Sequence, residues 1–309
     1  MLDPRYDNDK EPLLELNALQ LKMKRQVEQK VKDGIYKFED VPCAVCDGSN
    51  FELLSQKDRY GLYMPVVICK DCGLIQTNPR MDQDAYNEFY DTEYRKLYVG
   101  VEKPTSDYFQ GQYSRGREMF ERLKTNNLLK ASENMFVLEV GCGSGGILQY
   151  FKEQGCQVKG VDLGEAYIGY GINQHSLDLS VGTLDTLNLD KAPDLIIYSH
   201  VLEHVLTPND ELRKVYNSLS DEGLLYIEVP SVKNLMNKYS YGMDFLRLMQ
   251  NAHTYHFTPR SLCNLLGRNN FELVFSRTGQ FLHSVFKKIE TEYSSMMQFL
   301  QKLELIRGH

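Results

Sequence analysis

Four of the seven cysteines form two pairs, each with two residues between its members. Cys43 pairs with Cys46 and Cys69 with Cys72, and 22 residues separate the pairs. Four thiolates spaced in this way can surround a zinc ion as a tetrahedron, with bonds of about 2.3 Å. Since all four positions are cysteine, none is left open for a substrate. We therefore predict a structural zinc site within residues 39–80; two redox pairs or four buried thiols are the alternatives.

Each cysteine pair is followed closely by a glycine, Gly48 or Gly73. Glycine adopts the left-handed backbone conformation that a tight turn around a metal needs. Zinc ribbons often bind nucleic acid, which requires clustered positive charge. Around these cysteines, positive and negative side chains balance one another. They are Lys57, Arg59, Lys70, Asp47, Glu52, Asp58 and Asp71.

A run of glycines follows a short apolar segment in VLEVGCGSGG, residues 137–146. Glycine at the end of a strand lets the backbone approach a ligand closely. Asp162 ends the next apolar segment, where a carboxylate can accept both ribose hydroxyls of an adenosine. The spacing of Gly141, Gly143 and Gly146 also fits the fingerprint of dinucleotide sites. The pattern therefore predicts an adenosine-type cofactor without saying which one.

Three residues that can move a proton follow the apolar segment 193–199: they are His200, Glu203 and His204. His256 lies further along the chain, in HTYHFTP. Histidine is the commonest general base, and open α/β sheets bind ligands beyond the carboxyl ends of their strands. We take all four as candidate catalytic residues. The alternative for each is a structural role, with its side chain bonded within its own loop.

From residue 135 onward, short apolar segments alternate with segments of helical length. This alternation predicts an α/β fold, a Rossmann-like and mostly parallel seven-stranded sheet with helices on both faces. The last two strands are so close that only a hairpin can join them, so the terminal strand should be antiparallel. The predicted strands are 135–140, 157–162, 179–182, 193–199, 222–229, 271–278 and 281–288. The predicted helices are 11–33, 82–98, 106–130, 145–154, 165–173, 208–219, 259–268 and 290–306.

The helix predicted at 11–33 has apolar residues at helical spacing, and we expect it to pack on its own chain; an arm that forms a homodimer is the alternative. The net charge of -7 argues against nucleic acid as a partner. The first residues lack the apolar core of a secretion signal, and no apolar run is long enough to span a bilayer. We therefore expect a cytoplasmic protein with reduced cysteines and no membrane partner.

The string LEVGCGSG closely resembles motif I of class I S-adenosylmethionine-dependent methyltransferases. Asp162, GTLD at 182–185 and DLIIYSHVLEH at 194–204 follow in the order of that family, and the resemblance covers roughly residues 106–289. It implies S-adenosylmethionine as the cofactor and favours it over a nicotinamide. The cofactor-binding residues that it implies are Glu139, Gly141, Cys142, Gly143, Asp162, Leu163, Thr183, Leu184 and Ser199.

The resemblance also implies what most of these residues contact. Gly141 and Gly143 would line the methionine and ribose portion, while Thr183 and Leu184 would flank the adenine. Asp162 would bind the ribose. Glu139 would contact the amino end of the cofactor, and Ser199 and His200 would face its sulfonium. For Cys142, a small buried residue inside the turn is the alternative.

The tyrosine-rich helices that precede the core would cover the cofactor, as in relatives. Arg115 and Arg117 could then reach the cofactor carboxylate, since arginine suits that group. The alternative for either arginine is a solvated helix face. The predicted domains are an N-terminal helix at 1–38, the zinc-ribbon module at 39–80, a helical connector and cofactor cover at 81–130, and the methyltransferase domain at 131–309.

The combination of a four-cysteine module, a helical connector and a class I core resembles bacterial methyltransferases of sugar and surface-polysaccharide pathways. Their deoxysugar C-methyltransferases have a Glu-His pair in the active site after the fourth strand, which implies catalytic roles for Glu203 and His204. Those enzymes continue into a further domain, whereas this sequence ends at His309. We therefore expect O-methylation of a small-molecule or sugar-type acceptor, at a hydroxyl, carboxylate or phosphate-type oxygen. The alternatives are a zinc-module RNA base methyltransferase and an inactive binding or scaffold protein.

Overall fold

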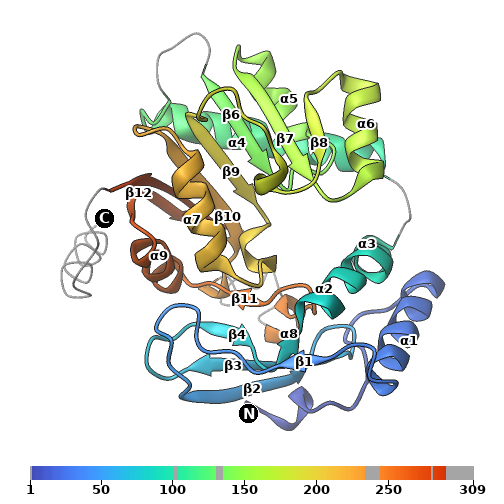
Figure 1. The fold of residues 1–309 in the computed structure, drawn as a ribbon. Coiled ribbons are helices and arrows are strands. Elements are labelled where there is room, and N and C mark those ends of the chain that lie inside the picture. Colours follow the sequence, from blue (N-terminus) through green and yellow to red (C-terminus); the bar gives the residue numbers. More distant parts are fainter. Residues whose placement is uncertain (1, 101–103, 130–134, 234–243, 280, 290–309) are drawn as a thin grey trace.

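The computed structural model describes residues 2–100, 104–129, 135–233, 244–279 and 281–289 (Figure 1). The helix predicted at 290–306 lies outside these residues. Within the described ranges, no helix combines the length and the apolar composition that a bilayer span needs.

The seven predicted strands form one sheet, in the order β12-β13-β10-β9-β6-β7-β8, which confirms the predicted fold class. The strands β10, β9, β6, β7 and β8 run parallel to one another. β13 pairs antiparallel with both β10 and β12, as a short hairpin requires. It is the last strand among the described residues, yet it lies inside the sheet, and β12 forms the edge. The bounds are β6 (Phe136–Val140), β7 (Gln157–Asp162), β8 (Leu179–Val181), β9 (Leu195–Ser199), β10 (Leu224–Pro230), β12 (Phe271–Thr278) and β13 (Phe281–Lys288).

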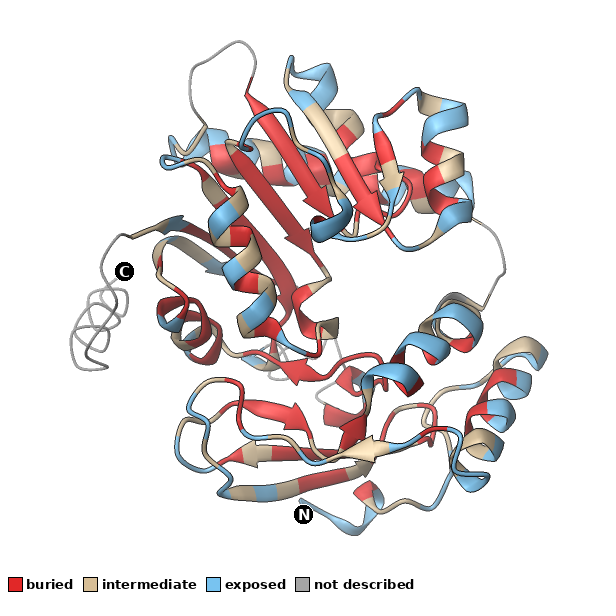
Figure 2. Ribbon diagram, in the orientation of Figure 1, coloured by how far each residue is buried: buried red, intermediate tan, exposed pale blue. Residues whose placement is uncertain are grey.

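Helices cover both faces of this sheet, as predicted. Successive strand residues point to opposite faces, so Ile196 and Ile197 of β9 belong to two different hydrophobic clusters. The first cluster includes leucines of α7 and α9, and the second includes apolar residues of α4, α5 and α6. Figure 2 shows β6 and β9 buried along their whole length. The helix bounds are α4 (Ser106–Thr125), α5 (Gly146–Glu153), α6 (Glu165–His175), α7 (Pro208–Ser218) and α9 (Pro259–Arg268).

The first long helix, α1, spans Ala18–Lys32, so its predicted start at residue 11 is wrong. Asn17 caps the helix in a capping box, which satisfies backbone N–H groups that would otherwise lack partners. The apolar side of α1, which includes Met23 and Val27, packs in one cluster with residues of α2 and α3. The prediction that this helix packs on its own chain is confirmed.

The helix predicted at 82–98 is three consecutive pieces. They are α2 (Gln83–Phe89), a π-helical turn η2 (Tyr90–Tyr94) and α3 (Arg95–Val99). Single π-helical turns inside α-helices are frequent at functional sites. The next helix, α4, begins as predicted and ends at Thr125, short of residue 130.

A second sheet, in the order β11-β4-β3-β2, contains strands from both ends of the chain. β11 (Tyr255–His256) belongs to the segment after β10, and it pairs antiparallel with β4 of the cysteine module. The segment after β10 therefore leaves the large sheet and joins the module. The remaining elements are η1 (Pro4–Tyr6), β1 (Phe38–Glu39), β2 (Phe51–Lys57), β3 (Tyr63–Cys69), β4 (Ile75–Thr77), β5 (Arg80–Met81), η3 (Leu184–Thr186), η4 (Leu202–His204) and α8 (Phe245–Leu248).

The cysteine module packs directly on the α/β core. Cys43 and Leu74 share a hydrophobic cluster with the buried leucines of α7 and α9. Arg268 of α9 donates from Nη1 to the carbonyl oxygen of Val45 at 2.8 Å. These contacts hold the module against the α/β core, on the side where β11 lies (Figure 1).

Two glycines in α6 offer a matched test of how tightly this helix packs on the α/β core. A Cβ atom on Gly171 would lie 2.4 Å from the carbonyl oxygen of Ser144, whereas a Cβ on Gly169 would meet nothing within 4 Å. We expect Gly171→Ala to lower the free energy of unfolding by about 1–3 kcal/mol through overpacking. We expect Gly169→Ala to raise it by up to about 1 kcal/mol, because alanine favours the helix. Urea denaturation of both variants would contradict the packing if the two changes had the same sign and size.

Candidate functional site

The glycine turn after β6 is the centre of the site. Gly141 and Gly143 have positive φ angles of 71° and 54°. A Cβ on Gly141 would lie 2.3 Å from Cγ2 of Val201, and a Cβ on Gly143 would lie 2.7 Å from the hydroxyl oxygen of Tyr108. Both the backbone conformation and the space therefore require glycine, which leaves backbone groups facing a ligand directly.

Helix α4 holds this turn from the side. The side-chain amide of Gln112 donates to the carbonyl oxygen of Cys142 at 3.0 Å and accepts from the Ser144 hydroxyl at 3.0 Å. The Cys142 side chain is fully buried, and a Cβ on Gly160 of β7 would lie 2.7 Å from its Sγ. Cys142 thus packs its side chain into the core, so only its backbone is left to face a ligand.

Asp162 ends β7 and joins three segments. Its Oδ2 accepts from the Gly143 N–H at 2.9 Å, and its Oδ1 accepts from the Gly164 N–H at 2.7 Å. The Nη2 of Arg95 also donates to Oδ1, at 3.0 Å, while its guanidinium lies over the ring of Tyr167. Sequence reasoning missed Arg95, because nothing in its neighbourhood along the chain places α3 next to β7.

The loops after β7 and β8 lie side by side next to this carboxylate. The N–H of Gly182 donates to the carbonyl oxygen of Asp162 at 3.0 Å. Leu163, next to Asp162, is 61% exposed. Thr183 is exposed and Leu184 is buried. The structure therefore brings together the residues that the sequence pattern assigned to the ribose and adenine.

Buried polar atoms without hydrogen-bond partners gather at and just beyond the carboxyl edge of the large sheet. Among the described residues, twelve buried side-chain nitrogen and oxygen atoms lack a partner, and eight of them belong to six residues here. Leaving such an atom unpaired costs about 1–3 kcal/mol, so each one marks a position where a ligand, an ion or a water molecule can bind. The six residues are Glu139, Ser199, Glu203, Glu228, His253 and His256.

Glu139 lies in β6 and is 1% exposed, with no hydrogen bond to either carboxylate oxygen. Burial raises the pKa of this carboxyl well above its ordinary value, and the nearby charge of Arg115 opposes that shift. A cationic ligand group at this position would favour the ionised carboxylate and so offset the free-energy cost of burying it. Arg115 thus faces the site, as one of the sequence alternatives proposed, whereas Arg117 is exposed.

His200 follows β9 with a φ of 57°, in the left-handed region that a non-glycine residue enters only at a cost. Its Nε2 lies 3.1 Å from Oε1 of Glu228, and its Nδ1 lies 3.4 Å from Oε1 of Glu203. Burial alone would lower the pKa of this imidazole, but the two carboxylates outweigh it and raise the pKa above its ordinary value. Its side chain remains 22% exposed, so it can reach a bound molecule.

Sequence reasoning missed Glu228, although it is the single charge in the buried strand LLYIEVP. The Nε of Arg115 lies 3.3 Å from its Oε1, and Nδ1 of His283 lies 3.3 Å from its Oε2. Burial would raise the pKa of Glu228, but these groups and His200 hold it well below its ordinary value. A lone charge in a buried strand was the signal that could have revealed it.

His204 is held on one side by the loop that contains Ala252. Its Nδ1 lies 2.9 Å from the carbonyl oxygen of Ala252 and is also bonded to the Tyr90 hydroxyl. Its ring centroid is 4.7 Å from that of His253. Burial is the main cause that lowers the pKa of His204, and it lowers that of His253 further.

His256 lies in β11, on the sheet of the cysteine module, with its ring centroid 6.0 Å from that of His253. Burial lowers its pKa to about 3, and its Nε2 has no hydrogen-bond partner. All four predicted catalytic residues therefore lie in one region, with His256 at its far wall.

The four paired cysteines also converge. Their sulfur atoms all lie within 4.8 Å of one another, and the closest pairs are Cys43 with Cys72 at 3.4 Å and Cys46 with Cys69 at 3.5 Å. Sulfur atoms bound to one zinc ion at about 2.3 Å would be roughly 3.8 Å apart. The cluster is therefore compatible with a zinc-binding module.

The glycines of the two cysteine turns have different roles. Gly73 has a φ of 79°, as predicted, but in the first turn Asp47 has the positive φ, at 57°. The prediction that Gly48 supplies the left-handed conformation is wrong. Glycine is favoured at position 48 for another reason: a Cβ atom there would lie 2.8 Å from Oδ2 of Asp71 and 3.3 Å from Sγ of Cys46.

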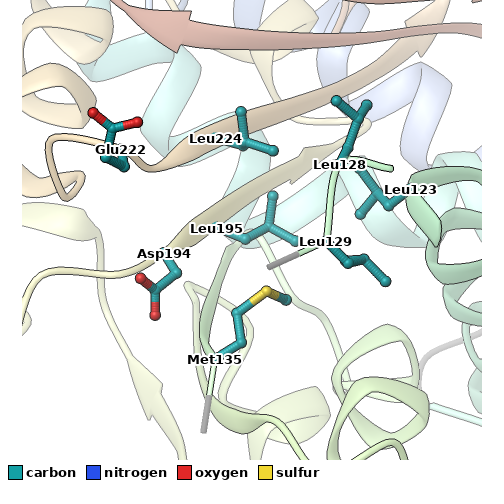
Figure 3. A pocket seen from close by; sticks show the side chains of 8 residues that line it. All are labelled: Leu123, Leu128, Leu129, Met135, Asp194, Leu195, Glu222 and Leu224. Carbon is teal, nitrogen blue, oxygen red and sulfur yellow. The ribbon is translucent and has the colours of Figure 1, made fainter. Parts of the chain in front are cut away.

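A small apolar hollow lies at the opposite end of the large sheet (Figure 3). It is lined by Leu195 and Leu224, which begin β9 and β10, and by Leu123 of α4. Because parallel sheets bind ligands beyond the carboxyl ends of their strands, this hollow is a packing gap and not the functional site.

Comparison with known proteins agrees with this geometry. An uncharacterized methyltransferase of Staphylococcus carnosus is 26% identical over 155 residues, which span 47% of this chain and 74% of that protein. A ubiquinone biosynthesis O-methyltransferase of Bartonella tribocorum is also 26% identical over 155 residues, spanning 46% of this chain and 62% of that protein. The chain thus spans less than two thirds of the length of the second relative.

The structure of the plantazolicin methyltransferase BpumL, in complex with a monoazolic desmethylPZN analogue and SAH, shows the same fold. It has a TM-score of 0.51 and 16% identity, covering 66% of this chain and 93% of that one. The model of the methyltransferase domain family matches residues 112–275, which is more than half of the chain. The chain therefore belongs to the methyltransferase domain family.

Proposed function

We propose that this protein transfers a methyl group from S-adenosylmethionine to an oxygen of a small-molecule or sugar-type acceptor. The observation that carries the proposal is the group of buried, unpartnered polar atoms around the glycine turn. Family membership supports methyl transfer. The relative named an O-methyltransferase supports an oxygen as the acceptor atom.

The residues around the glycine turn fit the cofactor. Glu139 presents a buried carboxyl without a partner, which suits the cationic amino end. Gly141 and Gly143 have no room for a Cβ beside Val201 and Tyr108, so only their backbone can contact the cofactor. Asp162 keeps one lone pair free on Oδ2 within the described contacts, so two ribose hydroxyls require Arg95 to release Oδ1. The exposed Leu163 gives an apolar surface for the adenine.

The bound cofactor supplies a methyl group already activated by its sulfonium. The chain must align the acceptor and remove its proton. We propose that His200 accepts the proton that the acceptor loses. Its side chain is accessible and lies between Glu203 and Glu228, which would stabilise the imidazolium that forms. Glu203 and His204 lie behind it, and His256 belongs to the wall of the site.

Replacing the residue assigned to the ribose tests cofactor binding. We expect Asp162→Ala to weaken S-adenosylmethionine binding more than about tenfold, because it removes charge-assisted hydrogen bonds. Asp178→Ala, at an exposed carboxylate that pairs with Lys159 of the same strand, should leave the affinity unchanged. Calorimetric titrations with S-adenosylmethionine and with NAD measure both. Tight NAD binding, or an unchanged isotherm for Asp162→Ala, would show that the assigned pocket is wrong.

The second test separates catalysis from cofactor binding. We expect His204→Ala to lower turnover, because His204 lies behind the proposed acceptor position. The affinity for S-adenosylhomocysteine should stay nearly intact, because His204 is not at the glycine turn. Turnover is followed with methyl-labelled cofactor and a panel of hydroxyl, carboxylate and phosphate acceptors. Full activity of the variant would make His204 purely structural.

The third test concerns the cysteine module, for which we propose a structural zinc ion. Cys43→Ser should release zinc and loosen residues 40–80, because the metal replaces a hydrophobic core in so small a segment. Cys156→Ser, at a cysteine outside the cluster, should keep the metal. Elemental analysis gives the zinc content, and hydrogen exchange gives the local stability. A fully folded wild type without zinc would contradict the proposal.

A further inference from the structure

Three side chains beyond the carboxyl edge of the sheet converge in a way that the proposed proton transfer does not require. One ligand atom from each of Glu203, His204 and His253 lies within 4.8 Å of the others. They come from two separate segments, the turn η4 and the loop before β11. Oε1 of Glu203 lies 3.9 Å from Nε2 of His204, which is too long for a hydrogen bond.

The inner atoms of this cluster lack partners. Glu203 is 1% exposed, and neither of its carboxylate oxygens has a hydrogen bond. Nδ1 of His253 is also buried without a partner. The contact between Glu203 and Nδ1 of His200, at 3.4 Å, lacks hydrogen-bond geometry and leaves the carboxylate lone pairs unused. A buried carboxylate in this state calls for a cation or donors that the described part of the chain does not supply.

The outer nitrogen of each imidazole is already engaged. Nδ1 of His204 bonds to the carbonyl oxygen of Ala252, which leaves Nε2 as the free acceptor facing Glu203. Nε2 of His253 accepts from the side-chain amide nitrogen of Gln250, so the neutral ring carries its proton on Nδ1. His204 has the arrangement of a metal-binding histidine, in which an outer N–H donates and sets the orientation of the ring. Metal binding at Nδ1 of His253 requires that its proton move to Nε2 and that the amide of Gln250 turn to accept it.

The two segments that carry the cluster are also joined by backbone. The carbonyl oxygen of Glu203 accepts from the N–H of Thr254 at 2.8 Å and from its hydroxyl at 3.1 Å. Tyr86 donates to the carbonyl oxygens of His204 and Ala252. The positions of the three side chains are therefore set by contacts outside the cluster.

We propose that Glu203, His204 and His253 bind a divalent transition-metal ion, separate from the four-cysteine site. Two imidazoles and one carboxylate favour zinc, iron, manganese or cobalt over calcium or magnesium, which prefer oxygen ligands alone. Three protein ligands leave at least one coordination position open. Given the proposed function, that position faces the acceptor beside His200, where the ion would polarise the acceptor oxygen.

Cobalt is a suitable probe because its absorption reports the ligands. The full chain with one zinc ion per molecule, enough for the four-cysteine site alone, is titrated with Co²⁺, without methyl donor or acceptor. We expect about one Co²⁺ per chain with visible d–d absorption but no thiolate charge transfer, because cysteine takes no part in this site. Thiolate charge transfer alone, or no absorption beyond free cobalt, would overturn the proposal.

Variants identify the ligands. His253→Gln and Glu203→Gln should each weaken cobalt binding more than about tenfold. His256→Gln is the matched control, since His256 is equally buried in the same region but outside the cluster, and it should keep the absorption. Thermal unfolding of each variant confirms that it is folded. Equal loss in His256→Gln, or unchanged binding in folded His253→Gln, would show that the assigned ligands are wrong. The titration contains no methyl donor, so a failure to bind metal can be distinguished from a failure to transfer a methyl group.

Discussion

The carboxylate of Asp162 is the contact on which the site depends. It accepts from the N–H of Gly143, from the N–H of Gly164 and from the guanidinium of Arg95. One side chain thus sets the glycine turn after β6, the loop after β7 and the position of α3. A ribose bound there, as we propose, would compete for the same oxygens, so its binding and the position of the helical cover would be coupled through a single carboxylate.

The second constraint is the path of the chain after β10. Instead of continuing directly to the next helix of the α/β core, this segment adds β11 to the sheet of the cysteine module. His253 and His256 come into the site by this route. The module therefore forms part of the wall of the site, and a metal ion among its cysteines would stabilise the site from a distance.

The electrostatics of the site follow from three acidic side chains that are each 1% exposed, Glu139, Glu203 and Glu228. Glu228 lies beside Arg115, His200 and His283, and Glu203 lies 3.4 Å from Nδ1 of His200. Glu139 and Glu203 lack hydrogen bonds, so the protein bears a cost that cationic ligands can offset. A sulfonium cofactor with an amino group, and a metal ion, are ligands of that charge.

Local patterns in the sequence were enough to predict the seven strands, their hairpin, the glycine turn and the two cysteine pairs, because each depends on residues close together in the chain. The bounds of α1 were set by one capping residue that periodicity does not reveal. Only the tertiary structure placed Arg95 on Asp162, Glu228 beside His200 and His253 beside His204. These pairs come from segments far apart in the sequence, and the order of strands in the sheet, together with the excursion to β11, decides which of them meet.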